Sequence, residues 1–565
     1  MSGDFSTMSA SSPASAARRA AASPPSPPPM HRMSHSWDVI RPHLQAQRWA
    51  RGRSRIRSRG GTPGFTASRR RSATATPERC QHRKTCYGWR PAAGDNRDQR
   101  PYHWPMHCGG TPLSVTERLA DFVMVHGASP LPDAVQHQAR RLLLNAAAAS
   151  ASGHDHPAIR RLREWAIDGI AGGAARLLWH GDRTSGDRAA LVNGAMLEVL
   201  DFNETHIEAF VHPTAPVWPA VQATAELAGA SLADAVTATA LGIEVELAVA
   251  TMLMPAHYEQ GFNPAVAAGA VGAAAGCSVI LGLDVERTAD ALGLAALGGA
   301  GPLEVLGTYV HPYRIGDVAR SGFTAADLAR RGFTAPPTAI DGEHGLLATV
   351  AERDPERIED ALGSLGDEWR ICGPIAFKRY PTETISQAPL DCILDLRERT
   401  PPEKLSQVAS MTFAVAPLVA EVNRSRRERF GVLADDQQAR FDGSYCAAAA
   451  WCAGRFTVEE LGAEARSDPA VLALRDKVSF VADEGRGMES ASLDVTFADG
   501  TTEHAATEAF GGSTANPLSD EDLLAKLTAA ATGIIDTGRI NDISAAINGD
   551  PPDLTAGDFV ALLAL

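Results

Sequence analysis

Cysteine is scarce in this sequence: the 565 residues include eight, and no two are spaced as CxxC. Several lie inside apolar stretches, which is typical of reduced, buried thiols in a cytoplasmic protein and argues against a disulfide-linked scaffold. The cysteines and histidines between Cys80 and Cys108 are irregularly spaced. Because structural zinc sites use regularly spaced ligand pairs, we expect no metal there.

Aromatic residues make up only 6% of the sequence, whereas alanine and glycine abound. Small side chains favour closely packed helices over a strand-rich sandwich. The stretch 265–283 carries no charge, but it is mostly alanine and glycine. A membrane span needs about 20 predominantly large apolar residues. We therefore expect a buried central helix here and no association with a membrane.

Several catalytic motifs are also missing. The sequence has no phosphate-binding glycine loop, no GxSxG elbow, no HExxH and no cluster with metal-ligand spacing. Nucleotide-dependent chemistry and metal-dependent hydrolysis are therefore not expected, and no cofactor is predicted.

Charge divides the chain into two regions. Residues 1–105 carry 19 Lys and Arg against 5 Asp and Glu, whereas the remainder has a net charge of −28. The basic region is rich in Ser, Pro and Arg and lacks periodicity, so we expect it to be disordered. The alternatives are a transit peptide, a nucleic-acid-binding arm, or a true start of translation near Met106. We place the function in the acidic remainder and do not expect nucleic acid as a partner.

The acidic remainder shows two kinds of sequence periodicity, one typical of helices and one typical of strands. Helical patterns run through 112–375, and Ser114 and Glu117 form a capping box before the first of them. Asp499-Gly500 is a hairpin signal. Strand-like alternation marks three segments, 408–415, 476–483 and 491–505.

The predicted fold is mainly α with α+β. It has a large all-α domain over 112–375, a smaller α+β lid domain over 376–510, and helices over 511–565 that return to the all-α domain. A cleft between the two domains is the expected binding site.

The stretch 200–219, LDFNETHIEAFVHPTAPVWP, gathers polar residues at a helix junction. Asp201 and Thr205 are four residues apart, so they share a face if they end a helix. Pro213 biases His212 towards an extended conformation and opens the next helix, so His212 would lie at a helix N-terminus that favours an anion. A carboxylate substrate fits such a place. The structural alternative is that Asp201 and Thr205 cap helices and His212 fills a joint.

Three further stretches place polar or basic residues beside Gly or Pro at helix borders. They are GFNPAVAAG (261–269), YVHPYRIG (309–316) and IAFKRYPTETISQ (375–387). Loops at the ends of elements often carry function, although each stretch taken alone also fits a surface turn.

Taken together, these stretches resemble the MmgE/PrpD family, which includes 2-methylcitrate dehydratase, cis-aconitate decarboxylase and iminodisuccinate epimerase. The matching blocks occur in the family's order, and the resemblance covers about 112–565. The blocks are Asn193-Gly194, 200–206 with 212–214, 261–264, 311–316, 378–381, 441–445 and 516–519.

The resemblance implies a helical domain with an α+β lid, a homodimer, and no iron–sulfur cluster. It also implies a pocket for small di- or tricarboxylates. The positions that match the family's pocket residues are Asp201, Thr205, His212, Lys378 and Tyr445.

Five positions depart from the family pattern. Glu198 and Gln387 stand where the family often has His, and the other three lie in the predicted pocket. Asn263 stands where the family usually has His, His311 where it usually has Lys, and Arg314 where it usually has His. An asparagine cannot transfer protons at neutral pH. Arg314 can still bind a carboxylate through its bidentate fork. We expect Thr205 and these three residues to bind substrate.

The chemistry implied by the resemblance begins with proton removal α to a carboxylate. His212 is the predicted base, because an imidazole titrates near neutrality. Lys378 and Arg314 would stabilise the developing charge, with His311 as a further candidate. Asp201 would orient a histidine or bind a substrate hydroxyl, and Tyr445 would act as an acid from the lid.

We therefore predict a cofactor-independent carbon–oxygen lyase of the dehydratase type, acting on a small di- or tricarboxylate. An epimerase or racemase on the same scaffold is one alternative, and a decarboxylase is another. A catalytically disabled carboxylate-binding homologue is the alternative of a different class, because Asn263 and His311 alter the proton-transfer set.

Overall fold

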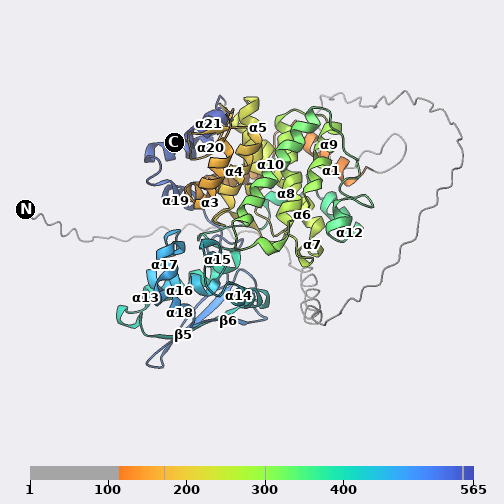
Figure 1. Cartoon of the computed structure of the whole chain (residues 1–565). Coiled ribbons are helices and arrows are strands. Elements are labelled where there is room, and N and C mark those ends of the chain that lie inside the picture. The colour runs from red at the N-terminus through yellow and green to blue at the C-terminus, as the bar shows by residue number, and fades with distance from the viewer. Residues whose placement is uncertain (1–112, 171, 300, 550–552) are drawn as a thin grey trace, which may run out of the picture. The chain divides into compact units, whose positions relative to one another are not determined.

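The computed structural model describes residues 113–565 except 171, 300 and 550–552. The expectations for residues 1–105, including the absence of a zinc site after Cys80, lie outside these described residues. Helices dominate the described chain and a small sheet accompanies them, so the fold is mainly α with α+β, as predicted (Figure 1).

The helical part packs around two apolar helices, α6 (Leu232–Leu253) and α8 (Pro264–Ile280), which are buried along most of their length. Their backbones touch, since a Cβ at Gly272 would lie 2.6 Å from the Gly242 carbonyl oxygen. Among the described residues, α6 alone is long and apolar enough to cross a membrane, and 89% of its apolar window is buried in the protein. The uncharged stretch after residue 264 forms a buried central helix, as predicted.

The other elements of this part surround α6 and α8. They are α1 (Val115–Gly127), α2 (Asp133–Gly153), α3 (Pro157–Ile167), β1 (Ala175–Arg176), β2 (Arg183–Thr184), α4 (Gly186–Glu198), α5 (Thr214–Ala228), α7 (Ala256–Glu259), α9 (Val285–Ala295), α10 (Val310–Arg330), α11 (Leu346–Val350) and α12 (Pro355–Gly363). The predicted capping box of Ser114 and Glu117 is present at the start of α1.

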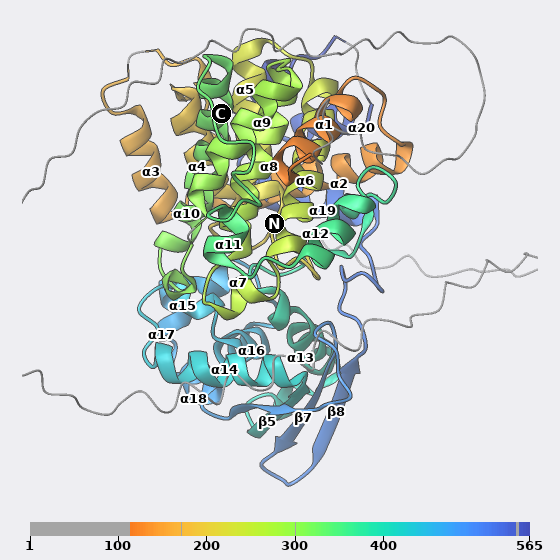
Figure 2. The same cartoon turned by 90° about the vertical axis from the view of Figure 1, so that its right-hand side faces the viewer.

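The α+β part is built on a four-stranded sheet with the order β6-β5-β7-β8, of which Figure 2 labels β5, β7 and β8. β5 (Val408–Val415) runs parallel to β6 (Val478–Ala482) and antiparallel to β7 (Ala491–Phe497). β7 and β8 (Thr502–Thr507) form a hairpin that turns at the predicted Asp499-Gly500, where Gly500 has a φ of +81°. The accompanying helices are α13 (Gln387–Arg399), α14 (Pro417–Phe430), α15 (Asp436–Arg440), α16 (Gly443–Ala453), α17 (Ala463–Ser467) and α18 (Pro469–Arg475).

The last three helices contribute to the core of the helical part. They are α19 (Asp520–Ala531), α20 (Thr537–Gly549) and α21 (Ala556–Leu562). Leu523, Ile543 and Phe559 are buried in the same hydrophobic cluster as α2. α19 starts at a capping box of Ser519 and Asp522.

A two-stranded sheet connects the helical part to the start of the α+β part. β3 (Glu204–His206) pairs antiparallel with β4 (Ile375–Phe377). The expectation that Asp201 and Thr205 share a helix face is therefore wrong, because α4 ends at Glu198 and Thr205 lies in β3. Pairing with a strand far along the chain outweighs the local helical pattern. The same pairing brings Lys378, which follows β4, to Asp201.

The five described cysteines are free. Cys277, Cys392 and Cys446 are buried, as expected for reduced structural thiols, whereas Cys372 and Cys452 are exposed. The expectation of burial was therefore only partly right, since an apolar stretch does not decide which side of an element a residue occupies.

Candidate active site

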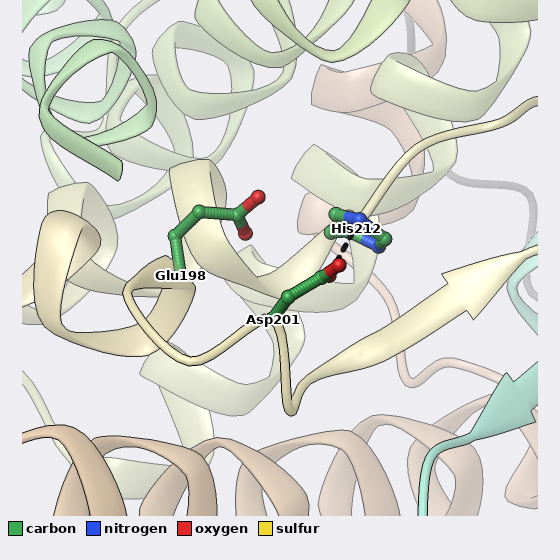
Figure 3. Close-up of side chains that lie close together, drawn as sticks. All are labelled: Glu198, Asp201 and His212. Atoms are coloured by element: carbon green, nitrogen blue, oxygen red, sulfur yellow. Dashed lines mark ion pairs between the residues drawn. The ribbon is translucent and has the colours of Figure 1, made fainter. Parts of the chain in front are cut away.

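Asp201 is the centre of the candidate site, because two basic side chains converge on its carboxylate. The Lys378 ammonium group donates to Asp201 Oδ1 and, at 3.1 Å, to the Asp201 carbonyl oxygen. His212 Nε2 lies 3.3 Å from the same Oδ1 (Figure 3). Asp201 itself has a φ of +49°, a left-handed conformation that residues with a side chain rarely adopt. Three residues singled out in the sequence are thus brought together.

The imidazole of His212 is held at Nδ1 by the backbone and faces Asp201 with Nε2. Its Nδ1 lies 2.7 Å from the Glu204 carbonyl oxygen, which can only accept, so Nδ1 carries a proton. Thr205 Oγ1 lies 3.1 Å from the same nitrogen and 2.8 Å from Thr384 Oγ1. The His212 side chain is 20% exposed, against 5% for Asp201 and none for Lys378. A ligand can therefore reach the cluster at His212.

A second buried cluster joins Glu198 to His311 and Arg314 of α10. His311 Nε2 lies 3.1 Å from Glu198 Oε1, and Arg314 Nη2 donates to His311 Nδ1 at 3.0 Å. Since a guanidinium only donates, His311 Nδ1 accepts and the ring proton sits on Nε2, facing Glu198. Burial lowers the pKa of His311, and Glu198 opposes this shift. His311 is therefore a neutral donor in this arrangement.

The charges of this second cluster follow from burial and its neighbours. Burial alone would raise the pKa of Glu198, but the charge of His212 and the N–H of His311 lower it to about 2. Asn203 Nδ2 also donates to Glu198 Oε2 at 2.7 Å. Burial lowers the pKa of Arg314 to about 10, so its guanidinium stays charged at neutral pH, and it donates to the Pro302 carbonyl at 3.0 Å. At neutral pH the cluster thus holds one anion, the Glu198 carboxylate, which already accepts hydrogen bonds from its neighbours. It also holds one cation, the Arg314 guanidinium.

The donor atoms of Glu198, Asp201 and His212 lie within 4.8 Å of one another, as a metal site would require (Figure 3). The carboxylates, however, already have cationic or N–H partners in Lys378 and His311. A divalent cation bound to Asp201 would lie beside the Lys378 ammonium group, and the two positive charges would repel each other. The donor set therefore fits proton transfer and anion binding better than metal coordination.

Three lid residues that were not predicted as site residues lie in the same region, although one of them, Phe441, opens the matching block 441–445. Arg426 of α14 donates to Glu383, and its guanidinium carbon lies 5.2 Å from the centre of the Phe441 ring. Phe441 also meets His311 edge to face, with 5.7 Å between ring centres. Burial raises the pKa of Glu383; Arg426 opposes this rise and Asp201 adds to it. Arg426 belongs to a run of charges that resembles a solvated helix face, so no local signal marks it.

Two predicted site residues have other partners. The Asn263 side-chain oxygen accepts from Ala265 N at 2.9 Å, so Asn263 caps α8. The backbone N–H of Asn263 donates to the Gly301 carbonyl, beside Arg314. Tyr445 is buried in the lid core, and its hydroxyl donates to the Glu460 carbonyl at 2.5 Å. The role of Tyr445 as an acid stays a prediction, with its proton directed at the lid backbone.

Comparisons with known proteins agree with the block pattern. The MmgE/PrpD N-terminal domain matches residues 117–358 and the MmgE/PrpD C-terminal domain matches 380–548. The chain is 26% identical to cis-aconitate decarboxylase of Mus musculus over 75% of this chain and 88% of that protein. It is 27% identical to the Homo sapiens enzyme of that name over 63% and 74% of the two chains. It is 23% identical to the cis-aconitate decarboxylase-like protein oryM of Aspergillus oryzae over 80% and 97%. The two domain matches span most of the described residues, and the chain belongs to the MmgE/PrpD family.

Proposed function

We propose that this protein is a lyase that acts on a small di- or tricarboxylate through proton transfer by its own side chains. The pair of His212 and Asp201 is the observation that carries this proposal. His212 is held at Nδ1, its Nε2 faces Asp201, and it is the most exposed of the converging groups. An imidazole with one fixed and one working nitrogen is suited to exchange a proton with a bound substrate.

Basic groups near His212 are suited to bind the carboxylates of such a substrate. Arg314 comes from the helical part and Arg426 from the lid. A guanidinium binds a carboxylate through two parallel N–H bonds, so two of them suffice for a substrate with two or more carboxylates. Their placement on two parts of the fold would make binding depend on both.

Decarboxylation is the reaction that the arrangement favours. With Nδ1–H donated to a carbonyl, an unprotonated Nε2 would point its lone pair at the Asp201 carboxylate, whereas a protonated Nε2 donates to it. His212 is therefore suited to start as an acid. As a carbon–carboxylate bond breaks and CO2 leaves, its electron pair forms a new double bond. The old double bond then takes the Nε2 proton at a carbon α to a carboxylate. The names of the relatives support this choice.

Lys378 favours a second candidate, elimination of water. A neutral His212 would remove a proton α to a carboxylate, and the Lys378 ammonium beside Asp201 would stabilise the charge that develops. The β-hydroxyl group then leaves as water by taking up the proton that His212 removed, and an alkene forms. This is the dehydratase reaction. It uses the same residues, but here His212 first accepts a proton, whereas in decarboxylation it donates one.

Product analysis tests the proposal. The full chain is incubated in D2O with cis-aconitate, 2-methylcitrate or citrate, with and without EDTA, and followed by NMR. Decarboxylation gives CO2 and a product with one deuteron on a carbon α to a carboxylate. Elimination gives an alkene from a hydroxy acid. Both should be insensitive to EDTA.

Other outcomes would redirect the proposal. Deuterium uptake without loss of CO2 or water would indicate an epimerase. Saturable binding of all three compounds without any exchange would indicate a carboxylate-binding homologue that has lost its chemistry. Activity abolished by EDTA and restored by a divalent cation would contradict proton transfer by side chains alone.

A further inference from the structure

Lys526 of α19 makes three hydrogen bonds from one ammonium group, although no sequence motif marks it. Its Nζ donates to Asn145 Oδ1 at 2.7 Å, to the Phe202 carbonyl at 2.8 Å and to the Lys378 carbonyl at 2.8 Å. An ammonium group has three N–H donors and no acceptor, so all of its hydrogens are used. The nitrogen also lies 3.8 Å from the centre of the Phe202 ring, where a cation is stabilised.

Two of these acceptors belong to the backbone that carries the Asp201–Lys378 pair. Phe202 follows Asp201 directly, and the other carbonyl is that of Lys378 itself. Lys526 therefore ties together the two segments whose side chains form the ion pair. Asp201 has a strained left-handed backbone, and such a conformation persists only where its surroundings hold it.

The third acceptor extends the same network to His212. Asn145 of α2 donates from Nδ2 to Glu204 Oε2 at 2.9 Å, and Glu204 Oε1 accepts from Thr214 N at 2.8 Å, at the start of α5. The Glu204 carbonyl holds His212 Nδ1. The ammonium group of Lys526 is thus bound directly to the Phe202 and Lys378 carbonyls and is linked through Asn145 and Glu204 to the imidazole of His212.

Burial and one nearby charge disfavour the protonated form of Lys526, and only Glu204 favours it. Burial lowers the pKa of Lys526 well below its usual value, the Glu204 carboxylate opposes this shift, and the nearby Lys378 adds to it. A buried ammonium group is tolerated only where its donors are satisfied. The three oxygen acceptors are therefore what keeps this cation in place.

We propose that Lys526 is a positioning residue: its ammonium group fixes the backbone on both sides of the Asp201–Lys378 pair and so sets the geometry of the proton-transfer site. The inference rests on the proposed function for its catalytic consequence, but the geometric part can be tested without turnover.

Kinetics of two matched variants test the catalytic consequence. Lys526→Met removes the ammonium group and keeps the stem, while Lys477→Met makes the same change at an exposed lysine in the lid that donates to the Val408 carbonyl. We expect Lys526→Met to lower kcat about tenfold to a hundredfold on the compound that wild type converts, with KM within about twofold. Lys477→Met should leave both unchanged. Lys526→Arg should not rescue, because a planar fork cannot meet three acceptors arranged around one nitrogen.

Lysine NMR tests the geometry itself, even if none of the three compounds is converted. The chain has only five lysines, Lys84, Lys378, Lys404, Lys477 and Lys526. Full-length protein labelled at lysine Cε therefore gives five signals, which single variants assign. Lys526→Met should shift the Lys378 signal and its titration, while Lys477→Met should not.

Two results would overturn the inference. One is a Lys378 signal and titration that are the same in Lys526→Met as in wild type. The other is a normal kcat in that variant on a compound that wild type converts. If Lys526→Met does not fold, Asn145→Ala replaces it, since it removes one acceptor and the link to Glu204 and should shift the Lys526 and Lys378 signals together. Absence of turnover by wild type, with the Lys378 shift present, would refute the proposed function and leave the positioning role standing.

Discussion

The two charged clusters of the site use the same kinds of residue in different ways. Around Asp201, two basic groups share one carboxylate, and His212 keeps a nitrogen that a ligand can reach. Around Glu198, His311 is fixed between a carboxylate and a guanidinium, so both of its nitrogens are occupied. Both histidines have a partner at each nitrogen, but the His311 side chain is buried, whereas the His212 side chain is 20% exposed and can exchange a proton with a substrate. The departures from the family pattern at His311 and Arg314 thus fall in the cluster suited to binding.

The largest expected effect comes from breaking the first cluster at Lys378. Lys378→Met leaves the Asp201 carboxylate buried with only His212 beside it. We expect the free energy of unfolding to fall by about 3–5 kcal/mol and turnover to fall at least about a hundredfold. Urea unfolding and steady-state kinetics measure the two effects. Equal stability of Lys378→Met and wild type would contradict the pairing of Lys378 with Asp201.

A second break, in the binding cluster, should change affinity more than rate. Arg314→Ala removes a charged fork, and we expect KM to rise about tenfold to a hundredfold with a smaller change in kcat. Arg320→Ala on the same helix is the matched control, because Arg320 pairs with Asp317 on an exposed surface. If Arg314→Ala lowered kcat and left KM unchanged, the division of labour between the clusters would be wrong.

The loss of folding stability at low pH tests the second cluster, which contains Glu198. Glu198 has a pKa of about 2 in the folded chain, against an ordinary 4.5. Its contribution to stability is therefore complete above its ordinary pKa and is lost as the pH falls towards 2; it amounts to about 3 kcal/mol. Unfolding free energy measured from pH 7 downwards should fall less steeply in Glu198→Gln than in wild type. Parallel curves for the two proteins would refute this assignment.

The smallest expected effect concerns Tyr445. Its hydroxyl donates to the Glu460 carbonyl, so Tyr445→Phe should lower stability by about 1 kcal/mol and change kcat by less than about threefold. Thermal unfolding and kinetics on the same preparation measure both. A loss of kcat beyond about a hundredfold would instead support the acid role that the family resemblance implies, and would mean that the lid rearranges when substrate binds.

Local sequence patterns predicted the elements well where contacts are local. The alternation over 408–415 matches β5, the uncharged stretch became α8, and the hairpin turns at Asp499-Gly500. They failed at 200–206, where a helix end was expected and a strand formed. The partner strand is β4, far along the chain, and no local pattern can show that pairing.

The residues of the site also divide into those that the sequence indicated and those that it did not. Asp201, His212 and Lys378 could be named because ordered blocks resemble a known family. Arg426, Glu383 and Lys526 could not, since each becomes significant only through contacts between distant segments. Burial and partner identity, rather than residue type, distinguish these groups from an ordinary surface charge.

Deuterium transfer by His212→Gln tests the central claim most directly. With a compound that the wild-type protein converts in D2O, we expect the wild type to place one deuteron on a carbon α to a carboxylate. His212→Gln should bind that compound with similar affinity, because the basic groups are intact, and should transfer no deuteron on the same timescale. Incorporation by His212→Gln at the wild-type rate would show that another group moves the proton and would contradict the account.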